Sequence, residues 1–307
     1  MNAKVSDLYV NWEQSNFDSC KYTPKLLKKN WLSLHDIDSE PFPDEEQLRH
    51  KLVSTDLSVT SPKYGNDFSS LSDELVQGWC EFHSGNFLDA VSIARSCGVA
   101  GSYLGNVSTV IYAGYLETEQ DKKLSLFNDV HERASEDAKH LKDCVNTFYM
   151  SPCSFGRYGE SVFVGTALAK NIPIRFRSSI KKTLEINSDH PLALAGYGAF
   201  YAQIIGYSGR FLARATFGCS EKECHSLFSK ALNIAEGSTI VRLEYAKALL
   251  MMDKKNKEAI TLLELIINTT PIDAMQELDI KAARLLINEE QRGLHYRDRS
   301  FSSGRTS

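Results

Sequence analysis

The sequence lacks a hydrophobic run long enough to cross a bilayer. Its longest nearly apolar stretch, residues 192–207, is shorter than the ~20 residues that a membrane-spanning helix needs. The N-terminus has neither the apolar core of a signal peptide nor a cysteine placed for a lipid anchor. We therefore expect a soluble, cytoplasmic protein with no membrane span.

The chain also lacks a strong excess of charge of one sign. Its formal net charge is -4 over 307 residues, which gives no electrostatic footprint for nucleic acid. The seven cysteines are odd in number and scattered along the chain. This distribution argues against a disulfide framework and favours free thiols in a reducing compartment.

Sequence signatures of catalysis are missing as well. There is no Gly-x-Ser-x-Gly elbow and no Walker loop, and Gly196 and Gly198 lack the third glycine and the preceding strand of a dinucleotide site. Cys219, Cys224 and His225 have no second Cys or His pair at zinc-site spacing. We expect no catalytic residues, no cofactor and no metal.

What the sequence does contain is helical periodicity. Ser72 is placed to cap a helix over 72–83, and Gly85 with Asn86 would end it. A return helix then begins at 87, with small residues at Ala90 and Ala94. A helix, a glycine turn and a helix with alanine at the crossing predict a pair of the tetratricopeptide-repeat type.

Small residues continue at four-residue spacing in the next segment, at Gly101, Gly105, Thr109 and Ala113, and predict close packing of helix backbones. An amphipathic helix is expected over 121–141. Ser151 and Pro152 would break the apolar pattern that follows it.

Proline marks the helix pairs of the second half. Repeats are predicted at about 160–191, from 192 onward, and at 239–271, with proline at 173 in a first helical turn. The second helix of the middle repeat, 221–235, is displaced by an insert at 206–218. A final helix over 274–288 should close the array with Leu278, Ala282 and Leu285 facing inward.

Three regions follow from these patterns. Residues 1–68 read as an irregular N-terminal lead-in with short helices at 23–34 and 44–54. Residues 69–290 form the helical-repeat domain, and residues 291–307 form a basic, serine-rich, flexible tail.

The run 154–286 resembles a family of bacterial tetratricopeptide-repeat proteins of uncharacterised role. The matching residues are Gly156 to Tyr158, Ala167 to Ala169, Leu184 to Asn187 with His190 and Pro191, Gly196 with Gly198, Glu244 to Leu249 and Thr270 to Ala274. More distantly, the chain is similar to regulators of microtubule dynamics and to the T-component proteins of TRAP transporters. It departs from the latter in lacking an export signal.

Periodicity and resemblance together predict an all-α, right-handed solenoid of antiparallel, tetratricopeptide-like helix pairs. The expected function is that of a non-enzymatic scaffold that binds a peptide or protein partner in a concave groove. Two alternatives stay open. One is a small-ligand-binding or substrate-delivery subunit whose pocket is closed by the 206–218 insert, and the other is an enzyme with an unrecognised site.

Candidate binding residues come from the first helices of the repeats and from the insert. Tyrosine and arginine are good interface anchors, and two arginines one helical turn apart can grip a carboxylate or a phosphate. Buried packing and surface ion pairs are the competing interpretations. The candidates are Tyr158, Tyr197, Tyr201, Gln203, Arg210 and Arg214.

Overall fold

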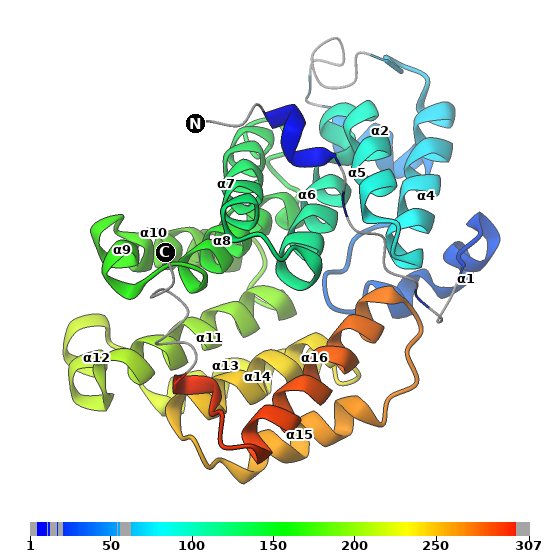
Figure 1. Cartoon of the computed structure of the whole chain (residues 1–307). Helices are drawn as coiled ribbons and strands as arrows, with labels where there is room; N and C mark the ends of the chain where they lie inside the picture. The colour runs from blue at the N-terminus through cyan, green and yellow to red at the C-terminus, as the bar shows by residue number, and fades with distance from the viewer. Residues whose placement is uncertain are drawn as a thin grey trace. The chain divides into compact units, whose positions relative to one another are not determined.

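The computed structural model describes residues 5–10, 12, 17, 21–53, 55 and 63–298. The described residues form helices without any strand, which confirms the predicted all-α class (Figure 1). None of their helices is long and apolar enough to span a membrane. Most of the predicted C-terminal tail, residues 299–307, lies outside the described part.

The chain divides into two compact units, which are treated separately. Unit 1 comprises Met1–His35, Ser39–Tyr158 and Ile272–Met275, and unit 2 comprises Asp36–Asp38, Gly159–Pro271 and Gln276–Ser307. The elements of the first half are η1 (Val5–Tyr9), α1 (Pro24–Leu34), α2 (Glu45–Leu52), α4 (Phe68–Ser84), α5 (Phe87–Ser96), η2 (Gly98–Gly101), α6 (Ser102–Ile111), η3 (Tyr112–Leu116), α7 (Gln120–Asp137) and α8 (Val145–Glu160).

The helix pair α4–α5 forms as the sequence predicts. Gly85 ends α4 with φ of 88°, a left-handed conformation that glycine adopts without steric cost. The predicted cap is wrong, because Asp67 rather than Ser72 caps the start of α4 and accepts a hydrogen bond from the Ser70 amide. Ser72 lies inside the helix and donates to the Pro43 carbonyl at 2.7 Å.

Helices α5 and α6 approach closely at the first residue of the small-residue ridge. A Cβ added to Gly101 would lie 2.2 Å from the carbonyl oxygen of Ala94, at the C-terminal end of α5. Backbone atoms cannot move aside as a flexible side chain can, so this position requires glycine.

Gly101→Ala is expected to lower the free energy of unfolding by about 1–3 kcal/mol, the usual cost of overpacking. Gly114→Ala is the matched control, since a Cβ there meets nothing within 4 Å. Urea unfolding followed by circular dichroism measures both changes. Equal midpoints for the two variants would contradict the close approach.

Helix α8 does not break at Pro152, contrary to the sequence-based expectation. The helix runs from Val145 to Glu160 with Pro152 inside it. Pro152 is buried together with Met150 and Phe155. We attribute the continuation to this buried face, because apolar burial can offset the hydrogen bond that proline cannot donate.

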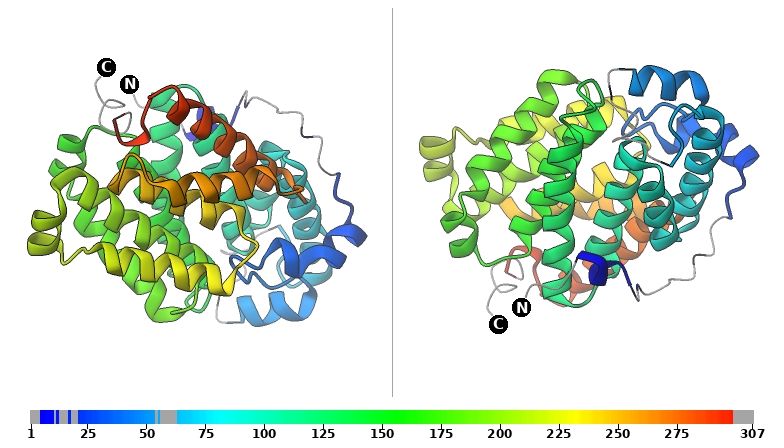
Figure 2. Two further views of the ribbon diagram at one scale, coloured as in Figure 1. Left: turned by 90° about the horizontal axis from the view of Figure 1, so that it is seen from below. Right: turned by 90° about the horizontal axis from the view of Figure 1, so that it is seen from above.

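Unit 2 is built from helices packed side by side. Helix α11 packs against both α13 and α14, and α14 packs against α15 (Figure 2). The elements of the second half are α9 (Val164–Ala169), α10 (Ile172–Ile186), α11 (Pro191–Ser208), α12 (Arg210–Phe217), α13 (Glu221–Ile234), α14 (Thr239–Met252), α15 (Lys257–Ile267) and α16 (Ala274–Gln291).

The start of α11 is capped by a buried histidine. The Nδ1 atom of His190 accepts a hydrogen bond from the Ala193 amide at 3.1 Å, and Pro191 occupies the first helical position. Burial lowers the pKa of His190 to about 4, although the Asp38 carboxylate opposes the shift. A neutral imidazole is therefore part of the helix cap.

The last helix turns a different face inward from the one predicted. Leu278 is buried as expected, but Leu285 is 60% exposed. Ala283 and Leu286 are buried in its place. The face that α16 buries includes positions 278, 283 and 286, so the prediction is right at 278 and displaced by one position at 282 and 285.

Candidate functional site

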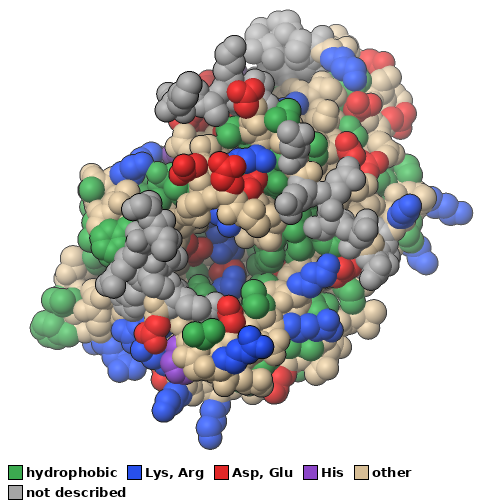
Figure 3. All heavy atoms as spheres, in the orientation of Figure 1, with side chains coloured by type: hydrophobic (Ala, Val, Ile, Leu, Met, Phe, Trp, Pro, Cys, Tyr) green, Lys and Arg blue, Asp and Glu red, His purple; other side chains and the backbone are tan. Residues whose placement is uncertain are grey.

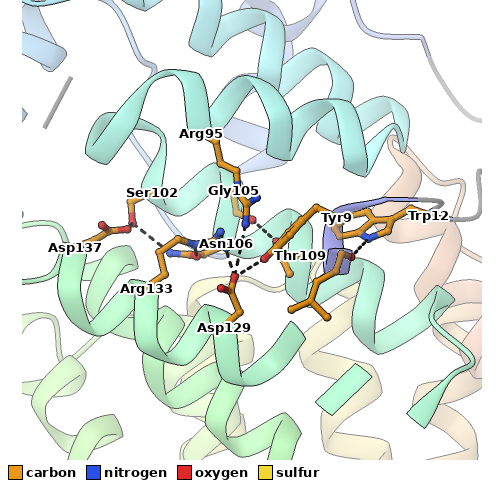
Figure 4. Close-up of polar contacts among 11 residues, drawn as sticks. Tyr9, Trp12, Arg95, Ser102, Gly105, Asn106, Thr109, Asp129, Arg133 and Asp137 are labelled. Carbon is orange, nitrogen blue, oxygen red and sulfur yellow. Dashed lines mark hydrogen bonds and ion pairs between the residues drawn. The ribbon is translucent and has the colours of Figure 1, made fainter. Parts of the chain in front are cut away.

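In unit 1, the N-terminal segment places an aromatic side chain among charged groups of α5 and α7. The Tyr9 hydroxyl donates to the Asp129 carboxylate at 2.5 Å. The guanidinium of Arg95 lies 3.5 Å from the centroid of the Tyr9 ring, and that of Arg133 lies 5.8 Å away. Both distances are within the range of cation–π attraction. Figure 4 shows Tyr9 between these residues.

The same segment also packs a tryptophan against an aromatic ring of η3. The rings of Trp12 and Tyr112 stack with centroids 3.9 Å apart and planes 4° apart. Trp12 is buried, and its Nε1 donates to the Leu8 carbonyl, which fixes the turn after η1. Tyr112 is itself held, because its hydroxyl bonds to Glu117 at 3.1 Å. We call Arg95, Asn106, Tyr112, Asp129 and Arg133 the N-terminal docking site.

A chain of polar contacts fixes Arg133. Its Nε donates to the Asn106 side chain at 2.7 Å, and its Nη1 lies 3.4 Å from Asp129 (Figure 4). Asn106 is fully buried and donates to Ser102, which donates to Asp137 at 2.6 Å. These contacts join α6 to α7 and set the direction of the guanidinium.

The docking site has more hydrogen-bond donors than its described residues use. Two guanidinium groups, Arg95 and Arg133, face the single carboxylate of Asp129. The Nη2 atom of Arg133 is buried and has no hydrogen-bond partner within the described part of the chain. A buried donor without an acceptor is unusual in proteins.

Burial keeps the phenol of Tyr9 protonated. It raises the pKa of Tyr9, and the neighbouring Asp129 carboxylate adds to the rise while Arg133 opposes it. The hydroxyl is therefore a donor at neutral pH, as its contact with the Asp129 carboxylate requires. Burial also raises the pKa of Asp137, although the hydrogen bond from Ser102 acts in the opposite direction.

A second candidate in unit 1 is a cavity beside a buried ion pair. Its volume of about 20 Å³ is bounded by residues that include Glu40, Lys51, Trp79 and Tyr103. A space of this size admits about one water molecule, far less than the ~300 Å³ of a typical organic-ligand pocket. We do not take it as a ligand site.

Two of the residues predicted from sequence lie together in unit 2. Tyr197 and Tyr201 on α11 are each 7% exposed, and the Tyr201 hydroxyl donates to that of Tyr197 at 3.3 Å. A hydrogen bond with Tyr197 raises the pKa of Arg177 on α10. The two tyrosines therefore offer little free surface.

The other predicted residues make separate contacts. Gln203 donates to Glu160 at 2.5 Å, and Arg210 pairs with Glu221 at 2.7 Å on the surface. Arg214 is exposed on α12, the helix formed by the predicted insert. Tyr158 belongs to unit 1 and stacks on Phe155 with ring centroids 6.5 Å apart.

The insert directs its large apolar side chains outward. Phe211 is 83% exposed and Leu212 is 55% exposed, whereas Ala213 is buried. Figure 3 shows hydrophobic side chains at the left edge, where α12 lies. In the described structure, these side chains do not line a closed pocket.

Sequence reasoning missed the docking site. Residues 1–68 read as an irregular lead-in, and Asn106 and Arg133 occupied unremarkable positions in helical patterns. The available signal was the spacing of Leu8 and Trp12, one helical turn apart, with Tyr9 between them. A short apolar and aromatic segment needs a surface on which to pack.

Comparison with protein-family models finds no matching family, and comparison with curated proteins finds no matching relative. The geometry of the docking site therefore carries the functional argument. Among the described residues, no three His, Cys, Asp or Glu side chains are grouped so that they could hold a metal ion.

Proposed function

We propose that this protein is a non-enzymatic helical scaffold that binds a short, aromatic segment of a protein partner. The observation that carries the proposal is the packing of Tyr9 and Trp12 against residues of α5, η3 and α7. In this structure, the chain's own N-terminal segment occupies the site. A partner segment with similar side chains would compete with it.

The proposed class of scaffold rests on how the helices are paired. Helices α4–α5 and α14–α15 are pairs joined by short turns, as in tetratricopeptide repeats. We infer a tetratricopeptide-like, right-handed arrangement from these pairs and from the small residues at their crossings. Such repeats commonly present peptide-binding surfaces.

The test uses the full chain with Tyr9→Ala and Trp12→Ala, which vacates the docking site. A fluorescently labelled synthetic peptide of residues 1–15 is titrated with this variant, and anisotropy is recorded. We expect saturable binding, because the peptide restores the stacking and the Asp129 hydrogen bond. The unaltered chain should bind the peptide more weakly, since a tethered segment competes at an effective concentration on the order of mM.

Two controls define the outcome. A peptide that carries the same two alanines should not bind, and adding Arg210→Ala and Arg214→Ala to the receptor should not change the affinity. Absence of binding by a folded vacated variant, judged by its circular dichroism and melting temperature, would overturn the proposal. If the receptor with Arg210→Ala and Arg214→Ala no longer binds the peptide, the binding site lies on α12 instead.

A further inference from the structure

The hydroxyl of Tyr9 makes a contact that a phenylalanine could not make. It donates to Asp129, whose side chain is only 15% exposed. Without this hydroxyl, the partly buried carboxylate would lose a hydrogen bond that it accepts, and a hydrogen bond to a charged group contributes more than one between neutral groups. The contact therefore distinguishes tyrosine from an otherwise similar ring.

The remaining contacts of the ring do not make this distinction. Arg95 stacks on the face of Tyr9, and cation–π attraction acts on phenylalanine as well as on tyrosine. Apolar burial of the ring is likewise shared by both residues. Selection between them must come from the hydroxyl and its acceptor.

Asp129 is held in place for this role. Arg133 lies 3.4 Å and Arg95 3.8 Å from its Oδ2 atom, so two guanidinium groups hold the carboxylate in place beside Tyr9. Arg133 is fixed in turn by Asn106 at 2.7 Å. Figure 4 shows these side chains converging from α5, α6 and α7. A preorganised acceptor discriminates strongly against a ligand that lacks the donor.

We propose that the N-terminal docking site recognises a tyrosine followed three residues later by a tryptophan, and that Asp129 is the residue that selects tyrosine over phenylalanine. The spacing comes from Tyr9 and Trp12, whose rings lie 5.6 Å apart and reach Asp129 and Tyr112 respectively. This inference rests on the proposed function, because it specifies the partner of the same site.

The experiment compares two peptides of residues 1–15, one with tyrosine and one with phenylalanine at position 9. The receptor is the full chain with Tyr9→Ala and Trp12→Ala. We expect the tyrosine peptide to bind at least about tenfold more tightly, the usual effect of a hydrogen bond to a charged group. Adding Asp129→Ala to the receptor should reduce this preference to nearly onefold.

Asp121→Ala, which removes an exposed carboxylate from the same helix, is the matched control and should leave the preference intact. If the Asp129→Ala receptor does not fold, Asp129→Asn replaces it. This variant should reduce the preference for the tyrosine peptide over the phenylalanine peptide. Equal binding of the two peptides to the receptor with Asp129 intact would overturn this inference and leave the proposed function standing. Binding of neither peptide would overturn the proposed function itself.

Discussion

Glu40→Ala is expected to lower the free energy of unfolding by about 3–5 kcal/mol, because it leaves Lys51 as an unpaired buried cation. The Lys51 ammonium lies 3.2 Å from Glu40, and the two side chains retain only 13% and 10% of their exposed surface. Burial by itself lowers the pKa of Lys51, but the Glu40 carboxylate raises it above the ordinary value. The lysine is therefore charged in the folded state.

Glu40 also joins three elements of unit 1, so its removal has consequences beyond the charge. Its Oε2 accepts from the Asn146 side chain of α8 at 2.6 Å, and its backbone carbonyl accepts from Trp31 of α1. The alanine variant keeps the backbone contact and loses both side-chain contacts. Chemical denaturation with urea, monitored by tryptophan fluorescence, measures the change.

The matched comparison is a surface pair on α2, the helix that carries Lys51. Glu45 and Arg49 lie 3.6 Å apart and are more than half exposed, so Glu45→Ala should cost less than about 1 kcal/mol. The double variant that combines Glu40→Leu with Lys51→Met should be much more stable than Glu40→Ala, because an apolar pair leaves no unpaired charge. Similar losses for Glu40→Ala and Glu45→Ala would contradict the buried-pair account.

Much of the helical pattern could be predicted from the sequence because local signals and burial agree there. Proline at 173 falls in the first turn of α10, as expected, whereas Pro191, predicted to end a repeat, begins α11. Pro152 shows where local signals fail. Its effect on the backbone is local, whereas the burial that keeps α8 continuous depends on residues distant in sequence.

The candidate site was less predictable for a related reason. The residues of the docking site come from α5, α6, η3 and α7, and no local pattern links Tyr9 of the N-terminal segment to Asp129, 120 residues away. The predicted tyrosines at 197 and 201 do share one helix face, as their spacing indicates. The hydrogen bond between the two tyrosines shows that they contact each other on that face, but it is no evidence that they bind a partner.

Acidification from pH 7 to pH 4 is expected to remove up to about 3 kcal/mol of stability through His190 alone. The pKa of His190 is lowered by burial to about 4, from an ordinary value of 6.5. Between these values the unfolded chain binds a proton that the folded chain does not, so stability falls as the pH falls through this range. One pKa unit corresponds to about 1.4 kcal/mol.

Besides burial, the hydrogen bond that caps α11 requires a neutral imidazole. A protonated Nδ1 cannot accept from the Ala193 amide, so charging His190 costs both desolvation and the cap. His190→Asn supplies a non-titrating acceptor at the same position and should flatten the pH profile by up to about 1.4 kcal/mol per pH unit between pH 6.5 and 4. His50→Asn, at an exposed histidine, should leave the profile unchanged. Urea unfolding at half-unit pH steps measures all three chains, and parallel profiles for wild type and His190→Asn would show that this imidazole does not control the acid sensitivity of the fold.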